Sequence, residues 1–385
     1  MDSLKNLTYL LEKRNSTALG VGPMSLNCIN ATIELANDNN VPLMMIASRR
    51  QIDCDSLGGG YVNNWSTENI SRYINQNDNF SNIVMSRDHG GPYQNNREIE
   101  ERYNTEEAMK SAKISFEVDI KNNFQIIHID PSIDPNNELS TEIIIERLKE
   151  LYDFCIETAE KNNKTIEIEI GTEEQSGGMN SIEELDYSLN EISKFCKKNN
   201  FKKPLFIVVQ TGTKVIETKN IGIFKDFSDE FERSQVPSLL KLCEKYGIYI
   251  KQHNTDYLES EFLNKHPKFG IHAANIAPEY GVAETRKIFE LIENKELPKI
   301  KDEMIELFVS SNKWQKWVMN KEKIDDYQKA LICGHYLFSS NKFLDIKNKL
   351  CHELKCNLKE IDLELKNAVK QSIYRHMKCF NLIIS

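Results

Sequence analysis

The sequence has 385 residues, and its 49 Lys and Arg residues against 58 Asp and Glu residues give a formal net charge of −9 with histidine neutral. A net acidic chain without a long basic cluster lacks the surface that nucleic acids require, which excludes nucleic acid as an expected partner. Its apolar runs fall far short of the ~20 residues of a membrane-spanning helix. The charged residues within positions 1–15 do not form a signal peptide. Composition therefore predicts a globular, cytoplasmic protein with no membrane partner.

Short apolar runs recur through the first three quarters of the chain, and most are separated by segments with helical periodicity. We predict strands at residues 18–22, 43–47, 83–86, 124–129, 165–170, 205–210, 248–252 and 269–273. Helices are expected at 26–37, 98–112, 141–161, 181–198, 233–245 and 259–265. This alternation is typical of a parallel sheet, and its count and length favour an α/β fold of the (β/α)8 TIM-barrel type. An open doubly wound sheet is the alternative, and the absence of a G-x-G-x-x-G motif after the first strand makes it less favoured.

The strand signals stop near residue 297, and the remaining chain has the pattern of amphipathic helices. These helices are predicted at 302–310, 312–320, 326–338 and 358–377. We therefore expect a TIM-barrel catalytic domain at 1–296 and a helical C-terminal extension at 297–385. The apolar stripe of the last helix is expected to pack on the barrel or on another subunit.

Polar residues gather where the predicted strands end. They are Arg49, Asp88, His89, Asp130, Glu173, Gln210, His253, Asp256 and Asn275. In a (β/α)8 barrel the carboxyl ends of the strands form the face that carries the chemistry. We therefore predict that the active site lies there.

Two histidines and a glutamate at this face have the chemistry of a catalytic metal site. Imidazole nitrogens from His89 and His253 with a carboxylate are typical of a three-ligand site that keeps one position open. Ile and Glu alternate in the fifth predicted strand, which turns Glu169 to the interior, and Glu173 follows in a loop. These four residues are the predicted ligands of a divalent metal, with zinc favoured over manganese or cobalt. An internal ion pair of the glutamates, for example with Lys251, is the alternative.

The catalytic and substrate-binding residues are expected around this metal. Asp88 and Glu173 are predicted to exchange protons, and Asp130 to bind a substrate hydroxyl or to hold a ligating histidine in its tautomer. His128 lies deeper and is interpreted as structural. The predicted substrate-binding residues are Gly59, Gln210, Gly212, Asp256 and Asn275. The loops with Gly59 and Gly212 can cradle phosphate through backbone N–H groups, although tight turns also need glycine.

Five blocks occur in a fixed order between residues 17 and 260: MSRDHGGP, FQIIHIDPS, IEIGTEEQSGG, FIVVQTGT and IYIKQHNTDY. This order resembles the tagatose-bisphosphate aldolase accessory-subunit family. The resemblance implies a metal-dependent class II aldolase-type barrel that is similar to ketose 4-epimerases. It carries over to Asp88, His89, Asp130, Glu173, Gln210, His253 and Asp256. The chain departs from the family pattern at the last strand, where residues 270–280 replace a Lys-x-Gly-Pro block and supply His272 and Glu279 as further candidates.

These observations predict a metal-dependent enzyme that acts on a ketose or ketose phosphate. The expected reaction is C4 epimerisation or aldol cleavage through an enediolate. A non-catalytic subunit that stabilises a tagatose-bisphosphate-type class II aldolase is the alternative that the resemblance implies. A Schiff-base aldolase with Lys251 as the reactive amine is a third and less favoured option. The expected partners are a sugar or sugar phosphate and either a second copy of the chain or an aldolase subunit.

Overall fold

The computed structural model describes residues 3–172, 181–222 and 234–383. Eight parallel strands close into a barrel, and β1 pairs with both β2 and β10. The strands are β1 (Ala18–Val21), β2 (Leu43–Ser48), β3 (Ile83–Gly90), β4 (Ile126–Ile129), β5 (Glu167–Ile170), β6 (Phe206–Val209), β9 (Tyr249–Gln252) and β10 (Ala273–Ile276). The predicted (β/α)8 barrel is confirmed.

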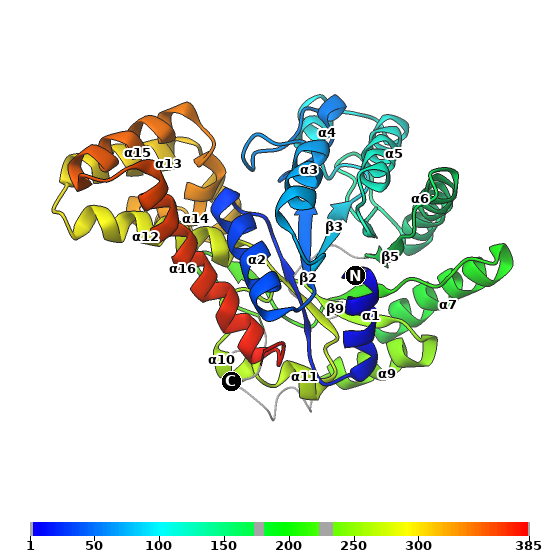
Figure 1. Cartoon of the computed structure of the whole chain (residues 1–385). Coiled ribbons are helices and arrows are strands. Elements are labelled where there is room, and N and C mark those ends of the chain that lie inside the picture. The colour runs from blue at the N-terminus through cyan, green and yellow to red at the C-terminus, as the bar shows by residue number, and fades with distance from the viewer. Residues whose placement is uncertain (1–2, 173–180, 223–233, 384–385) are drawn as a thin grey trace.

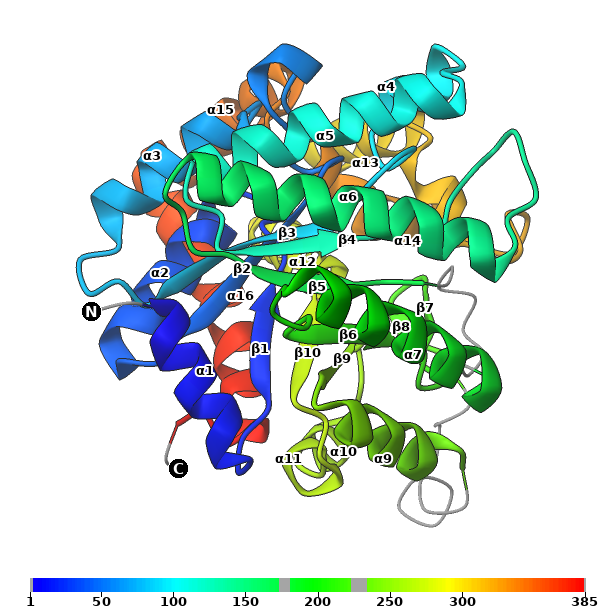
Figure 2. The same ribbon diagram turned by 90° about the vertical axis from the view of Figure 1, so that its right-hand side faces the viewer.

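Helices cover the outside of the strands, and Figure 2 shows α5, α6, α7 and α9 on one side of the barrel. The helices that follow the barrel strands are α2 (Leu26–Asn39), α3 (Thr67–Asn77), α4 (Asn96–Glu100), α5 (Thr105–Lys121), α6 (Thr141–Lys161), α7 (Ile182–Asn199), α9 (Val236–Tyr246), α10 (Ser260–Leu263), α11 (His266–Phe269) and α12 (Pro278–Glu293). The loops add the 3-10 helix η1 (Asp55–Leu57) and a hairpin of β7 (Val215–Ile216) and β8 (Lys219–Asn220). The single helix predicted at 98–112 is wrong, because Asn104 caps a new helix, α5, through a capping box with Glu107.

The eighth strand lies later in the chain than predicted. The run at 269–273 is apolar, but Gly270 adopts a φ of 79° and ends the short helix α11. The strand β10 begins at Ala273, which pairs with Ala18 of β1. Asn275 therefore lies inside the last strand rather than beyond it, and it pairs in register with Gly20.

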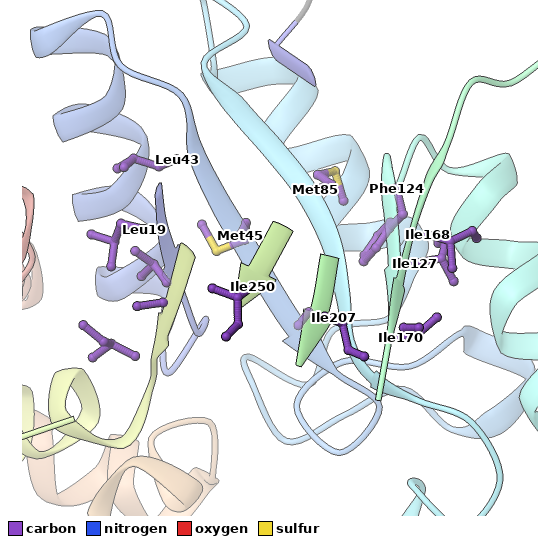
Figure 3. Close-up of a cluster of buried hydrophobic side chains, with 14 of the residues drawn as sticks. Leu19, Leu43, Met45, Met85, Phe124, Ile127, Ile168, Ile170, Ile207 and Ile250 are labelled. Atoms are coloured by element: carbon purple, nitrogen blue, oxygen red, sulfur yellow. The ribbon is translucent and has the colours of Figure 1, made fainter. Parts of the chain in front are cut away.

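Apolar side chains fill both faces of the barrel wall. Residues on the outer face pack under the helices, as the labelled side chains in Figure 3 show. The inner face is apolar toward the amino-terminal ends of the strands. There Met44, Val84 and Phe206 form one cluster with Leu7 of helix α1 (Ser3–Lys13). Helix α1 thus closes the amino-terminal end of the barrel. The polar interior lies toward the carboxyl ends of the strands.

The C-terminal extension consists of helices gathered on one side of the barrel (Figure 1). They are α13 (Pro298–Ser310), η2 (Lys313–Trp317), α14 (Asp326–Cys333), η3 (Gly334–Leu337), α15 (Asn341–Leu354) and α16 (Leu358–Cys379). The first five share a hydrophobic cluster to which Ile288 and Phe289 of α12 also contribute. Because α12 belongs to both parts, the domain boundary at 296/297 stays a prediction.

Helix α16 returns to the barrel and lies beside α2, as Figure 1 shows. Its buried residues Val369, Ile373 and Met377 join the core cluster of the barrel wall. Lys370 in α16 also forms an ion pair with Glu34 in α2. The second half of the apolar stripe therefore packs on the barrel, whereas Ile361 and Leu365 join the hydrophobic cluster of the extension. Within the described ranges, no helix is both long and apolar enough to cross a membrane.

Candidate active site and metal centre

A bulge at the end of β3 brings two consecutive side chains to the same cavity. The register between β3 and β4 shifts between Arg87 and Gly90, and His89 adopts a φ of 41°. Consecutive residues of a regular strand point to opposite faces, so this bulge is what lets Asp88 and His89 line one cavity. A Cβ at Gly91, which has a φ of 140°, would lie 2.4 Å from the carbonyl oxygen of Asp130. The glycines after the Asp-His pair thus allow the close approach of β3 and β4.

Four buried side chains place possible metal-ligand atoms within 4.8 Å of one another: Asp88 in β3, His128 in β4, Glu169 in β5 and His253 directly after β9. Nε2 of His253 lies 3.4 Å from Oε1 of Glu169 and 3.7 Å from Oδ1 of Asp88. Nδ1 of His128 lies 3.7 Å from the same oxygen of Asp88. Such a mixture of imidazole nitrogens and carboxylate oxygens suits zinc and related divalent ions.

The hydrogen bonding of the cluster is incomplete in a way that fits a cation. Oε1 of Glu169 is buried and has no hydrogen-bond partner among the described residues. A buried carboxylate oxygen without a partner is costly, and a bound cation removes that cost. The donor set and this oxygen therefore fit a divalent metal.

Glu169 also forms the ion pair that the sequence left as an alternative. Its Oε2 lies 2.6 Å from Nζ of Lys251, and both side chains are buried. Burial raises the pKa of Glu169, but Lys251 and the neighbouring histidines lower it to about 2 overall. The carboxylate thus bonds Lys251 through one oxygen and faces His253 with the other. This pairing disfavours a Schiff-base role for Lys251, which requires a free amine.

His89 lies beside the cluster and is held by Asp130. Its ring centroid is 5.0 Å from that of His253 and 5.5 Å from that of His128. Nδ1 of His89 lies 2.9 Å from Oδ2 of Asp130, which also accepts a hydrogen bond from Gln94. Burial lowers the pKa of His89, but Asp88 and Asp130 raise it to about 9 overall. Of the two roles that the sequence leaves open for Asp130, the geometry favours orienting His89, which leaves Nε2 of His89 for a ligand.

The structure brings the predicted metal ligands together only in part. Glu169 and His253 belong to the four-residue cluster, His89 lies next to it, and Glu173 lies outside the described residues. His128 joins the cluster although the sequence suggested a structural role. Its Nδ1 accepts a hydrogen bond from the backbone N–H of His89 (3.1 Å), which ties β4 to the bulge of β3. His128 and Asp130 lie two residues apart in an extended segment, so their side chains point to the same face. This spacing was the signal that could have placed His128 in the cluster.

A cavity of about 720 Å³ opens above the cluster. Asn275 lines it, and its Nδ2 lies 3.1 Å from Oδ1 of Asp88 and 3.0 Å from Nε2 of His253. Asp256 also lines the cavity, but its Oδ1 accepts hydrogen bonds from the backbone N–H groups of Ala277 and Glu279 at the start of α12. Burial, together with Glu279, raises the pKa of Asp256 to about 7. Both residues thus line the cavity, and Asp256 in addition caps a helix.

The other predicted substrate-binding residues lie in loops. Gly59 lines the same cavity, but its N–H donates a hydrogen bond to the carbonyl of Cys54. Gln210 lines a neighbouring cavity together with Thr172. Gly212 lies between β6 and β7 with a φ of 84°. Substrate contacts by these three residues stay predictions.

A model of the family described as D-tagatose-1,6-bisphosphate aldolase subunit GatZ/KbaZ-like matches residues 14–329. The chain belongs to this family. The match confirms the resemblance carried by the five sequence blocks and continues past them into the C-terminal extension. No curated protein matches the chain.

Solved structures with the same fold include sugar-related proteins of low sequence identity. A probable tagatose 6 phosphate kinase from Sinorhizobium meliloti 1021 is 15% identical with a TM-score of 0.70, and the match covers 94% of this chain and all of that one. The fructuronate-tagaturonate epimerase UxaE from Cohnella laeviribosi is 11% identical with a TM-score of 0.60, covering 95% and 81%. Fructose-bisphosphate aldolase from Campylobacter jejuni is 13% identical with a TM-score of 0.57, covering 100% and 96%. At these identities the likeness shows a shared barrel fold.

Two further candidates from the last strand lie away from the ligand cluster of this GatZ/KbaZ-like chain. His272 precedes β10, at the opposite end of the barrel from the cluster, where its Nδ1 accepts a hydrogen bond from the N–H of Ile250. Glu279 accepts a hydrogen bond from the N–H of Tyr257 and forms an ion pair with Arg375 of α16 at 2.7 Å. Both side chains thus connect elements of the fold: His272 contacts β9, and Glu279 links α16 to the barrel.

Residues of the C-terminal extension also line the cavity, which the sequence did not predict. Lys316 and Trp317 of η2 and Tyr336 of η3 line it together with residues of the barrel loops such as Arg50. No motif in the extension indicated this position. The contact depends on how the extension of this GatZ/KbaZ-like chain folds back over the barrel, which local periodicity does not reveal.

Proposed function

We propose that this chain is a metal-dependent enzyme that acts on a ketose or ketose phosphate by C4 epimerisation or aldol cleavage. The observation that carries the proposal is the buried cluster of Asp88, His128, Glu169 and His253 below a cavity of about 720 Å³. Family membership and the shared fold support the coarser assignment to aldolase-like and epimerase-like barrels. The metal, the sugar and the reaction are the parts that we add.

Glu169 and His253 would hold the cation, with Nε2 of His89 as a further ligand and Glu173 as the predicted ligand outside the described residues. The nitrogen and oxygen donors favour zinc, with manganese and cobalt as alternatives. When bound, the cation would polarise the ketose carbonyl and stabilise the negative charge of an enediolate. Lys251 keeps Glu169 ionised for this role.

Asp88 is the group that we assign to proton transfer. Its Oδ1 is held by Asn275 and faces the ligand cluster, whereas its Oδ2 lies 3.9 Å from Nε2 of His89. Burial raises the pKa of Asp88, but His89 and His253 lower it well below its usual range, so the carboxylate is ionised at neutral pH.

The chemistry starts when Asp88 accepts the proton of the C4 hydroxyl. The C3–C4 bond then breaks, which leaves an aldehyde and an enediolate. Rotation of the aldehyde followed by re-addition forms the bond on the other face, and Asp88 returns the proton to give the C4 epimer. Transfer of that proton from Asp88 to C3 of the enediolate, followed by release of the ketone and the aldehyde, instead gives aldol cleavage. Asn275 and Asp256 line the cavity in which the hydroxyl groups would be positioned.

The family description itself favours a second candidate function, that of an aldolase subunit. In that case the chain stabilises a separate class II aldolase and turns over no ketose alone. Co-purification with such a partner, combined with no turnover by the metal-loaded chain, supports this second function over the first.

The direct test of the metal proposal is chelation and reconstitution. EDTA is expected to abolish turnover of ketoses, and zinc or manganese to restore it. His253→Ala is expected to remain inactive after the metal is added back. Turnover that is indifferent to both EDTA and His253→Ala contradicts the proposal.

A further inference from the structure

Two cationic side chains from distant parts of the sequence line the mouth of the cavity. Arg50 follows β2, and Lys316 belongs to η2 of the C-terminal extension. Nε of Arg50 is buried without a hydrogen-bond partner, and in the described part of the chain neither residue has an ion pair. Two unpaired cations in one cavity are costly unless an anion binds between them.

The structure holds Lys316 in place without neutralising it. Its Nζ lies 4.9 Å from the ring centroid of Trp317 and 5.1 Å from that of Tyr336. Nε1 of Trp317 donates a hydrogen bond to the hydroxyl of Tyr336, and the backbone N–H of Glu217 donates one to the carbonyl of Trp317 (2.7 Å). Aromatic faces attract an ammonium group but leave its positive charge available to a ligand.

The carboxylates whose charges act on Arg50 are those of Glu98 and Asp130, and both are bonded to other side chains. Glu98 forms an ion pair with Arg49 at 2.7 Å, and Asp130 bonds His89. Although residue Lys316 as a whole is exposed, desolvation of its ammonium group and, to a smaller extent, the charge of Arg50 lower its pKa to about 8. The charge of Arg50 also acts on His89, so the two cations and the ligand cluster belong to one cavity.

We propose that Arg50 and Lys316 bind the phosphate group of a phosphorylated sugar. This inference rests on the proposed function, because it places the sugar in the same cavity. A phosphate monoester carries about −1.5 to −2 charges at pH 7 and matches two cations, whereas a carboxylate carries one. The planar guanidinium of Arg50 suits phosphate oxygens, and the ammonium of Lys316 adds a point charge. The barrel alone lacks Lys316, so the extension completes the substrate site.

The test is a calorimetric titration of the full-length protein with inorganic phosphate in EDTA. Lys316→Gln and Arg50→Gln are each expected to weaken phosphate binding by about tenfold, the effect of removing one charged hydrogen bond. Lys316→Arg is expected to retain most of the affinity. Lys323→Gln, which changes an exposed lysine of the same extension outside the cavity, is the matched control and is expected to bind as the unsubstituted protein does.

Unchanged affinity in Lys316→Gln, or an equal loss in Lys323→Gln, overturns the proposal. So does an absence of phosphate binding by the unsubstituted protein. Lys316 is exposed, so its replacement decides the question even if Arg50→Gln fails to fold. A second titration compares fructose 6-phosphate with fructuronate, and tighter binding of the uronate overturns the phosphate assignment. Because the phosphate titration needs neither metal nor turnover, its outcome is independent of the chelation test.

Discussion

Nζ of Lys251 lies 2.6 Å from Oε2 of Glu169, and both side chains are almost completely buried inside the barrel. The ammonium group also lies 5.3 Å from the ring centroid of Phe206, at the top of the apolar layer that helix α1 closes from below. The pair therefore stands between the apolar and polar parts of the interior. It balances one negative charge and leaves Oε1 of Glu169 facing His253.

Lys251→Met is expected to destabilise the protein by about 3–5 kcal/mol, because it leaves Glu169 as a buried charge without its cation. Urea unfolding in EDTA measures the loss. The matched control is Lys202→Met, which removes the cation paired with Glu167; the Lys202 side chain is 68% exposed, so the expected cost is below about 1 kcal/mol. Equal losses in the two variants contradict the buried pair. The double variant Lys251→Met/Glu169→Leu is expected to regain part of the stability.

His253→Ala and Glu169→Gln are expected to weaken zinc binding by more than about tenfold, because each removes a proposed ligand. Competition with a chromogenic chelator gives the affinities, and elemental analysis gives the bound metal. The control is His352→Ala, which removes a histidine of α15 whose side chain is 88% exposed. Zinc affinity that falls equally in His352→Ala, or in neither proposed ligand variant, rules out this cluster as the metal site.

Gly171→Ala is expected to disturb the site through His128. A Cβ at this position would lie 2.7 Å from Nε2 of His128, which is closer than real contacts allow. We expect a loss of about 1–3 kcal/mol in stability, as for other overpacked interiors, together with weaker zinc binding. Unfolding and zinc titrations measure the two effects. A variant as stable and as zinc-competent as the parent shows that the space beside His128 is not needed.

Glu284→Gln is expected to change how stability depends on pH. Glu284 in α12 accepts hydrogen bonds from Ser25 and Asn27, and burial raises its pKa to about 7. The unfolded carboxyl titrates near 4.3, so unfolding releases a proton between these values and the parent loses stability as the pH rises from about 4.5 to 7. Relative to Glu284→Gln, the loss reaches about 3 kcal/mol. Unfolding curves at pH 5 and pH 8 measure it, and parallel pH profiles contradict the raised pKa.

The barrel was predictable because each strand carries its own signal. Apolar residues on the outer face of the wall, such as Met45 and Ile168, pack under helices, and eight such runs define the fold. The boundary of the last strand was not predictable, because the apolar run at 269–273 contains Gly270, whose positive φ ends a helical turn. Tertiary packing, not local pattern, decides whether such a run forms a strand or a turn.

The candidate site was predictable where it depends on the ends of strands and on the alternation of side chains between the two faces of a strand. His253 and Glu169 come together because the carboxyl halves of parallel strands meet in the barrel. The role of Asp130 beside His89 depends on a bulge with a positive φ in a non-glycine residue, which no sequence rule specifies. The approach of Lys316 to the cavity depends on the fold of the whole extension.

The central claim is metal-dependent ketose chemistry, and NMR in D₂O tests it most directly. The zinc-loaded protein is mixed with ketoses and ketose phosphates, alongside the EDTA-treated protein and His253→Ala. We predict that only the zinc-loaded parent inverts C4 without taking up deuterium beside the carbonyl, or cleaves the sugar to trioses. If the zinc-loaded chain leaves every sugar unchanged, or if EDTA and His253→Ala do not reduce the turnover, the claim is contradicted.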